Sequence, residues 1–201
     1  MPPKLVRLTS DGDLVVRASG KRTTAPGDLE LVRAFINTAR LDRGDDDFDL
    51  PDDLRRWLVG HDLLAVSGDV GDGDLVVAVA VREALRDLAG ANTGRVPSDA
   101  ACATLDALSE ASGLRPHFEP GGTVALAPRA AGVGGALGRL IGIVVAAVGS
   151  GDWTRLKTCR NPACRWAFYD STRNRSGAWC DMAVCGSRAK SRAYYSRRRG
   201  G

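Results

Sequence analysis

Apolar side chains recur every three or four positions through most of residues 28–150, which is the spacing of one face of an α-helix. The periodic segments begin near residues that favour a first helical turn, namely Asp28, Pro51 and the Pro97-Ser98-Asp99 sequence. Gly113 and the Gly149-Ser150-Gly151 break are typical of helix ends. The pattern predicts five helices, over about 28–42, 50–58, 72–88, 98–112 and 134–148.

Two stretches outside these helices carry the signals of short strands. Residues 115–119 and 123–126 flank Pro120-Gly121-Gly122, which predicts a small β-hairpin covering one end of the helical bundle. The turn-rich first twenty residues predict a hairpin or a loose arm. Together these elements predict a mainly α N-terminal domain with a small β-hairpin, an α+β arrangement, over residues 1–150.

Charge divides the chain into two parts. The 201 residues carry 28 basic and 24 acidic side chains, but residues 151–201 hold 12 basic and only 3 acidic ones. This last quarter has a net charge of +9, against −5 for residues 1–150, and it contains four of the five cysteines and seven of the eleven aromatic residues. We therefore expect two domains, residues 1–150 and 151–201.

No segment of the sequence indicates export or membrane insertion. The first twenty residues lack the apolar core of a signal peptide. The longest uninterrupted apolar stretch, Leu140 to Val148, is nine residues, short of the ~20 that span a bilayer. We expect a cytoplasmic protein without membrane contact, in a compartment where clustered cysteines bind metal rather than form disulfides.

The cysteines of the last quarter form two equally spaced pairs, C-x4-C, fifteen residues apart. Two close thiolate pairs supply the four tetrahedral ligands that Zn²⁺ prefers, and a site with four protein ligands has no open position for catalysis. Residues 166–169 and 178–179 predict a hairpin between the pairs, and Asp181 predicts the start of a helix. We expect a treble-clef-like module holding one structural Zn²⁺, with these ligands: Cys159, Cys164, Cys180 and Cys185.

Basic side chains around this module indicate contact with nucleic acid. Arginine outnumbers lysine ten to two in residues 151–201, and its forked guanidinium suits phosphate and guanine edges. A solvated basic tail is the simpler alternative. The candidate nucleic-acid contacts are Arg173, Arg175, Arg188, Lys190 and Arg192.

These residues resemble a known family. The sequence from Cys159 to Lys190 is similar to the CGNR zinc finger, and Leu31 to Thr38 is similar to the asparagine-threonine helix of the ABATE domain that accompanies it. The resemblance implies a stress-responsive transcriptional regulator whose finger binds DNA. The family's signature asparagine is Ser187 here, so sequence preference can differ while zinc binding does not depend on this position.

Other functions stay open at this stage. The N-terminal domain is expected to regulate, through a small-molecule effector or a protein partner. Trp153, Trp166, Trp179 and the Tyr194-Tyr195 pair would serve as anchors if the module were a protein-interaction adaptor. Exposed aromatic side chains would equally suit stacking on single-stranded RNA. An enzyme is not expected, because no base and nucleophile pair, open metal site or cofactor loop is visible.

Overall fold

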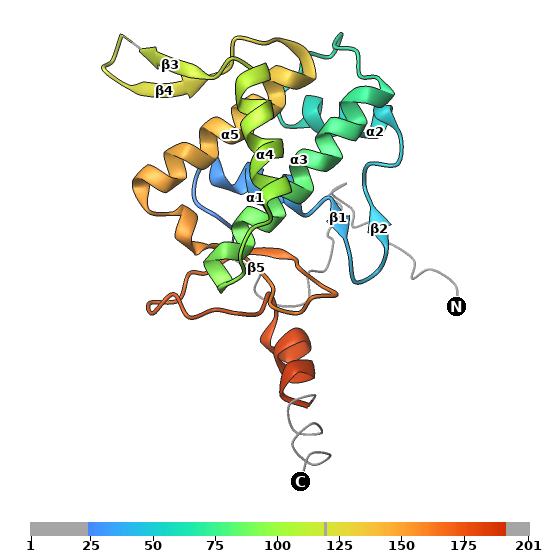
Figure 1. Cartoon of the computed structure of the whole chain (residues 1–201), viewed down its shortest axis with the longest axis vertical. Helices are drawn as coiled ribbons and strands as arrows, with labels where there is room; N and C mark the ends of the chain where they lie inside the picture. The colour runs from blue at the N-terminus through green and yellow to red at the C-terminus, as the bar shows by residue number, and fades with distance from the viewer. Residues whose placement is uncertain (1–23, 119, 192–201) are drawn as a thin grey trace, which may run out of the picture.

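The computed structural model describes residues 24–118 and 120–191 and is about half helical, with small antiparallel strand pairs (Figure 1). The hairpin or arm expected in the first twenty residues lies outside the described residues. The helices are α1 (Leu29–Ile36), α2 (Pro51–Gly60), α3 (Asp72–Gly90), α4 (Asp99–Ala111) and α5 (Gly132–Ser150), with shorter turns η1 (Ala91–Thr93), η2 (Trp153–Arg155) and η3 (Met182–Gly186). The strand pairs are β1 (Ala39–Arg40) with β2 (Asp45–Asp46), β3 (Arg115–Phe118) with β4 (Val124–Ala127), and β5 (Leu156–Thr158) with β6 (Ala167–Tyr169). The mainly α fold with a C-terminal cysteine cluster is confirmed.

Four helix boundaries follow local capping chemistry. Pro51 occupies the first turn of α2, and the Ser98 hydroxyl accepts a hydrogen bond from the Ala101 amide at the start of α4. Gly113 and Gly151 follow α4 and α5 with φ angles of +62° and +82°, in the left-handed region where glycine carries no Cβ penalty. These four boundaries are therefore encoded by the residues nearest to them.

Helix α1 is shorter than its apolar spacing predicts, because it ends at Ile36 instead of near residue 42. The Thr38 hydroxyl donates to the Phe35 carbonyl at 2.8 Å, which satisfies one of the last carbonyls of the helix. The chain then turns into the β1–β2 pair. Arg82 of α3 donates two hydrogen bonds of 2.6 Å to Asp46 in β2, so this segment is held by a tertiary contact that the local sequence does not encode.

The β3–β4 hairpin forms as predicted, with Arg115 opposite Ala127 and Phe118 opposite Val124. Strand β4 packs on α5, where a Cβ on Gly142 would lie 2.6 Å from the Leu126 carbonyl oxygen. Glycine at this position therefore permits the close approach of strand and helix. The residues of β3 are exposed, and Figure 1 shows the hairpin extending from the bundle beyond α5.

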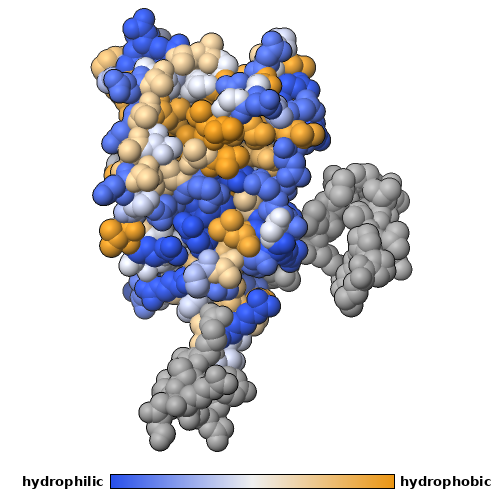
Figure 2. Space-filling model, turned by 45° about the vertical axis from the view of Figure 1, so that its right-hand side comes forward, coloured by the Kyte–Doolittle hydropathy of each residue, from blue (hydrophilic) through white to orange (hydrophobic). Residues whose placement is uncertain are grey.

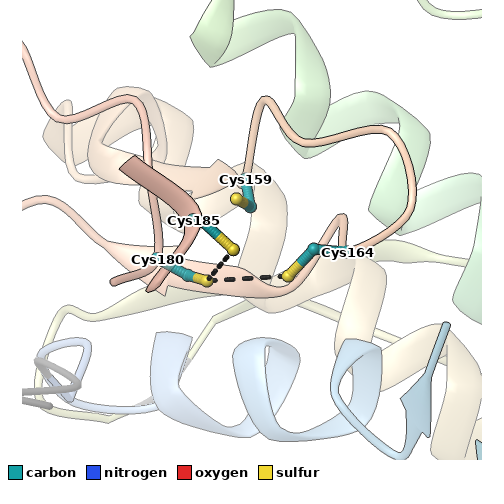
Figure 3. A group of neighbouring side chains, drawn as sticks. All are labelled: Cys159, Cys164, Cys180 and Cys185. Carbon is teal, nitrogen blue, oxygen red and sulfur yellow. Dashed lines mark hydrogen bonds between the residues drawn. The ribbon is translucent and has the colours of Figure 1, made fainter. Parts of the chain in front are cut away.

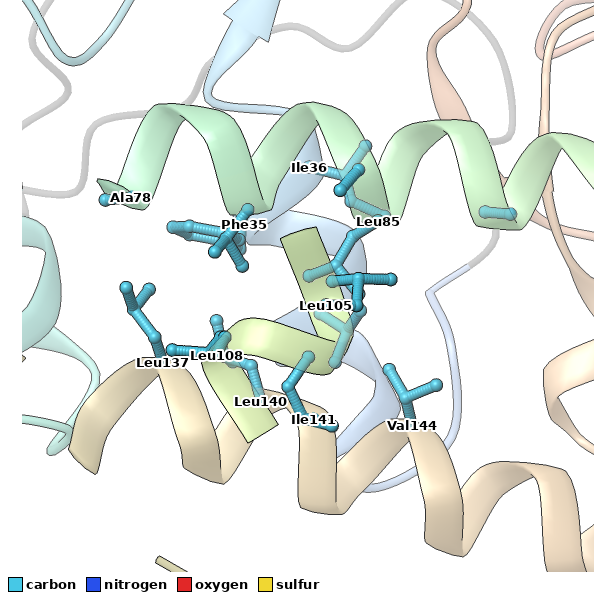
Figure 4. Packing of buried hydrophobic residues seen from close by; sticks show 14 of the residues in the cluster. Phe35, Ile36, Ala78, Leu85, Leu105, Leu108, Leu137, Leu140, Ile141 and Val144 are labelled. Carbon is cyan, nitrogen blue, oxygen red and sulfur yellow. The ribbon is translucent and has the colours of Figure 1, made fainter. Parts of the chain in front are cut away.

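The core lies between α3 and α5, with side chains of α1 and α4 filling the space between them (Figure 4). Phe35, Leu85, Leu137 and Leu140 are fully buried. Burying side chains of this size contributes about 1.5–3 kcal/mol each. The helical part of the molecule, residues 24–150, is thus held mainly by apolar burial.

Helix α5 is long and apolar enough to cross a membrane by length and composition. Half of its apolar window is buried inside the protein, where it supplies Leu137 and Leu140 to the core. It meets the composition test because Arg139 is the only charged residue in its nineteen positions. A buried core helix satisfies the same test, and the packing of α5 is that of a core helix.

The chain after α5, residues 151–191, forms the zinc module, and it shares the core of the helical part. Trp153, Leu156 and Ala167 belong to the same buried cluster as the helices. Strand β5 pairs with β6, with Leu156 opposite Tyr169. The predicted hairpin of residues 166–169 with 178–179 is wrong, because β6 pairs with a strand that precedes the first cysteine. Within the described residues, one backbone hydrogen bond reaches residues 178–179. It runs from the Arg160 amide to the Ala178 carbonyl, at 3.0 Å.

Candidate metal centre and the basic surface around it

Four cysteine sulfurs meet at one point of the zinc module (Figure 3). Cys159 follows β5, Cys164 lies in the turn before β6, and Cys180 and Cys185 flank the first turn of the last helix. Their Sγ atoms all lie within 4.8 Å of one another. The fold therefore brings the two cysteine pairs together from opposite sides of the cluster.

The spacing of the sulfurs matches a tetrahedral Zn²⁺ centre. With Zn–S bonds of about 2.3 Å, the edge of such a tetrahedron is about 3.8 Å. The Cys180 Sγ lies 3.6 Å from that of Cys164 and 3.9 Å from that of Cys185. The cluster fits one structural Zn²⁺, and four thiolates leave the ion without an open position.

The thiols depend on one another for ionisation. Hydrogen bonds from Cys164 and Cys180 lower the pKa of Cys159 to about 2. The hydrogen bond with Cys159 raises the pKa of Cys164 to about 12, and hydrogen bonds with Cys159 and Cys164 also raise the pKa of Cys180. A divalent cation removes this mutual opposition, because it favours the thiolate form of every ligand.

Asn161 organises the first cysteine pair. Its carbonyl accepts hydrogen bonds from the amides of Cys164 and Arg165, at 2.9 and 3.1 Å, which closes the turn between the two thiols. Its buried side-chain amide points to the Cys185 sulfur at 3.9 Å, so it also contacts the second pair. Such an outer contact to a thiolate orients the ligand and stabilises its charge.

The second pair is positioned by Asp181 and Gly186. The Asp181 carboxylate accepts from the Val184 amide at 3.0 Å, which confirms the predicted helix start. A Cβ on Gly186 would lie 2.6 Å from the Met182 sulfur and 3.4 Å from the Trp179 ring. A side chain at Gly186 would therefore require the exposed end of the Met182 side chain to move away from the turn that carries Cys185.

A buried ion pair fixes the loop between the two cysteine pairs. Lys157 Nζ lies 2.7 Å from Asp170 Oδ2, and both side chains are about 95% buried or more. Asp170 also accepts from the Thr172 and Gly177 amides, at 3.0 and 2.7 Å. Burial opposes ionisation, but the hydrogen bonds from Lys157 and Thr172 outweigh it and lower the pKa of Asp170 to about 2. The loop that carries Arg173 and Arg175 is thereby anchored at both ends.

The structure places four of the five candidate nucleic-acid contacts at the surface. Arg173, Arg188 and Lys190 are exposed and form no ion pair with any described residue. Arg175 is exposed too, and its guanidinium donates to the Thr154 hydroxyl at 3.3 Å. Arg192 lies outside the described residues.

Contacts that the sequence did not predict dock the module onto the helical part. The Asn37 amide donates to the Ala167 carbonyl and its oxygen accepts from the Ala167 amide, both at 2.8 Å, so this side chain pairs with β6 as a strand would. Arg86 is fully buried and donates to the carbonyls of Ile36 and Arg165, at 2.6 and 3.3 Å. The one signal in the sequence that could have predicted this docking is the polar Asn37 directly after an amphipathic helix.

The tryptophans that would serve as anchors in a protein-interaction adaptor pack inside the protein. Trp153 is buried in the shared core, and Trp166 and Trp179 are half-buried against the cysteine cluster. Tyr194 and Tyr195 lie outside the described residues. The described aromatic side chains therefore contribute to folding of the module more than to its surface.

Comparison with protein families gives two matches in sequence. Residues 29–151 match ABATE, described as a putative stress-induced transcription regulator, and residues 155–198 match the CGNR zinc finger. The matched families are of regulator and zinc-finger type and are not enzymatic. A search of curated proteins gives no match.

Proposed function

Since the chain belongs to the ABATE family and continues into a CGNR zinc finger, we propose that it is a stress-responsive regulator of transcription that binds duplex DNA through the zinc module. In this proposal residues 151–201 contact DNA and residues 1–150 form the regulatory domain. The protein acts in the cytoplasm and is not an enzyme.

The observation that carries the proposal is the excess of positive charge on the zinc module. Residues 151–191 carry eight basic and three acidic side chains, and the acidic ones all form hydrogen bonds within the protein. Asp152 accepts from the hydroxyls of Ser150 and Tyr169, Asp170 pairs with Lys157, and Asp181 caps the last helix. The exposed cations are therefore left to attract an external polyanion such as the DNA backbone.

Zn²⁺ has a structural part in this function. We assign Cys159, Cys164, Cys180 and Cys185 as its ligands, on the basis of their clustering within 4.8 Å. The bound ion supplies folding free energy to the module and no reaction chemistry. The chain's own residues then do the binding, since the cluster fixes the loop and the helix that carry the basic side chains.

The helical part suits a regulatory contact rather than a DNA contact. Residues 1–150 carry a net charge of −5, which disfavours approach to phosphate. Val66, Val76 and Val77 are exposed by 78, 69 and 47%, and Figure 2 shows apolar residues gathered on the upper half of the molecule. Exposed apolar surface of this kind supports a contact with a protein partner.

Selection from a randomised duplex pool tests the proposal. Zinc-loaded full-length protein is expected to retain duplex DNA at physiological salt and to lose it after chelation. For about six phosphate contacts, affinity should fall about a thousandfold between 50 and 200 mM salt.

The five-site variant R173A/R175A/R188A/K190A/R192A serves as the charge-removed counterpart and should bind weakly with a shallow salt dependence. Unchanged affinity in this variant would refute the assignment. Stronger competition by single-stranded RNA would indicate RNA binding instead, and failure to retain any nucleic acid would favour a protein-interaction adaptor.

A further inference from the structure

The last described helix of the zinc module has one side fixed to the metal centre and the other side free. Residues 182–191 are helical, beginning with η3. Cys185 and Gly186 are buried against the cluster, whereas the residues on the opposite side are exposed. In Figure 1 this helix leaves the body of the molecule at its lower end. Its free side is therefore presented outward in an orientation that the cysteines determine.

The free side has an unusual composition for a solvated helix. Its residues follow the i, i+1, i+4, i+5, i+8 spacing of one helical face, and they surround a shallow hollow of about 500 Å³. Most are small, and one is an arginine. We call this set the outer face: Ala183, Val184, Ser187, Arg188 and Ser191.

Small side chains let the backbone of a helix approach its partner closely. An α-helix with its side chains is about 10–12 Å across, and the major groove of B-DNA is about 12 Å wide. A helix face lined by alanine, valine and serine is at the narrow end of that range. The outer face therefore has the dimensions to enter the groove rather than to rest on its rim.

The positive charge of this last segment favours DNA over an apolar or cationic partner. Residues 182–201 contain six basic and no acidic side chains. Within the described part of the chain Arg188 has no ion-pair partner, so its five N–H donors are available to a ligand. Val184 is 42% exposed beside it, and a valine methyl group complements the C5-methyl group of thymine.

Building on the DNA binding proposed above, we infer that the outer face reads base edges in the major groove. Arg188 donates to N7 and O6 of a guanine, and Val184 contacts the methyl group of a thymine. The Ser187 hydroxyl donates to the Met182 carbonyl at 3.3 Å, so its oxygen is left to accept from a donor on a neighbouring base edge. Lys190, exposed outside the outer face, and Arg173 on the loop contact phosphates. Arg188 thus determines sequence specificity, whereas Lys190 contributes affinity for any sequence.

A matched pair of single variants separates these roles. Binding of the zinc-loaded full chain is measured against the enriched duplex and against a scrambled duplex. R188A should reduce the ratio of the two affinities by about 5- to 150-fold, the usual discrimination of one bidentate base contact. K190A should weaken both affinities by a similar factor and leave the ratio unchanged. Zinc content of each variant, measured alongside, should stay at one ion per chain.

Modified bases test the groove directly. Replacing thymine by uracil, or guanine by 7-deazaguanine, removes major-groove atoms and leaves the minor groove intact. Both replacements should weaken binding of the native chain, and the uracil penalty should disappear in V184A, as the deazaguanine penalty should in R188A. S187N should alter the enriched sequence at one position.

The outcomes distinguish base reading by the outer face from DNA binding as such. Duplex binding with a preferred sequence that neither R188A nor the modified bases affect would overturn the outer face as the reader while DNA binding stands. Duplex binding without any preferred sequence would do the same. Absence of duplex binding would overturn both this inference and the proposed function.

Discussion

The helical part and the zinc module are held together by different physical means. In the helical part, Phe35, Leu85 and Leu140 are fully buried in one apolar core, and burial of such side chains is the main stabilising contribution in proteins. The zinc module has a much smaller apolar cluster, formed by Cys159, Cys164 and Cys185 with two half-buried tryptophans around them. A core this small needs an additional constraint, which a metal ion provides.

The difference extends to the surfaces. Exposed valines mark the helical part, whereas Arg173, Arg188 and Lys190 mark the zinc module. In Figure 2 hydrophilic residues cover most of the lower half of the visible face, while apolar residues gather above. One chain thus separates two kinds of surface, with exposed apolar residues on the helical part and exposed cations on the metal-held module.

Metal removal is expected to have the largest effect on this comparison. Structural Zn²⁺ binding is worth about 10–16 kcal/mol at neutral pH, so chelation should abolish amide hydrogen-exchange protection in residues 159–186 and leave α3 and α5 protected. C185S should reproduce the effect, while C102S, at an exposed cysteine, should not. Simultaneous loss of protection in α5 would show one cooperative unit and end the distinction.

A core truncation in α5 should destabilise the helical part and leave the metal bound. L140A removes a fully buried side chain and should lower the free energy of unfolding by about 2–5 kcal/mol. V145A, at a position that is 47% exposed on the same helix, should change it by less than about 0.5 kcal/mol. Urea unfolding followed by circular dichroism measures both, and one zinc ion per chain should remain bound. Zinc loss in L140A under native conditions would contradict the prediction.

The junction between the two regions is tested by Asn37. N37A leaves the amide and carbonyl of buried Ala167 without their side-chain partner, at a cost of about 1–3 kcal/mol for each group. Exchange at the Ala167 amide should accelerate more than exchange in α5. N37D keeps the acceptor but places a carboxylate oxygen against the Ala167 carbonyl, so it should be destabilised as well. Equal acceleration throughout the chain would mean that Asn37 acts on global stability and not on docking.

Low pH should destabilise both regions, with a smaller difference between them than metal removal produces. A carboxyl group whose pKa is lower in the folded chain binds fewer protons there, so its stabilisation is complete above its ordinary pKa of 3.8 and is lost below it. Asp170, with a pKa of about 2, contributes about 2 kcal/mol at neutral pH and loses it between about pH 4 and pH 2. The hydrogen bond from Arg82 overcomes partial burial and lowers the pKa of Asp46 in the helical part, so that region weakens below about pH 4 too.

Thiolate ligands make the zinc module the more acid-sensitive region, because protonation releases the metal before these carboxylates titrate. In cobalt-substituted protein, the thiolate-to-cobalt absorbance should disappear at a higher pH than the helical circular dichroism signal. D170N should lower stability at pH 7, because it removes the carboxylate that pairs with Lys157. A single transition seen by both signals would contradict this order.

Features encoded by neighbouring residues were predictable from the sequence. Pro51, Ser98 and Gly151 act at helix ends within a few residues of themselves, and the cysteine spacing predicted the clustered thiols because each pair closes a short turn. These signals require no knowledge of the rest of the fold. The helices, the β3–β4 hairpin and the four-cysteine cluster followed from them.

Features that depend on distant residues were not predictable. Apolar spacing extended the first helix to residue 42, but it ends at Ile36 and its next residue, Asn37, pairs with Ala167, 130 positions away. Arg82 and Arg86 have the sequence pattern of an exposed charged face, yet both are buried by partners on other elements. The strand before Cys159 has a weak local signal, which is why β6 was assigned the wrong partner.

The core shared by the two regions has a consequence for the order of events during synthesis. Leu156 and Ala167 complete a cluster most of whose other members lie in the preceding helices, so the ribosome releases the helices before the residues that close over them. At about 5–20 residues per second, the twenty or so residues after α5 take about 1–4 s to be added. During that interval the nascent helices expose the surface that Leu156 and Ala167 later cover, and a chaperone that binds apolar surface has a transient target there.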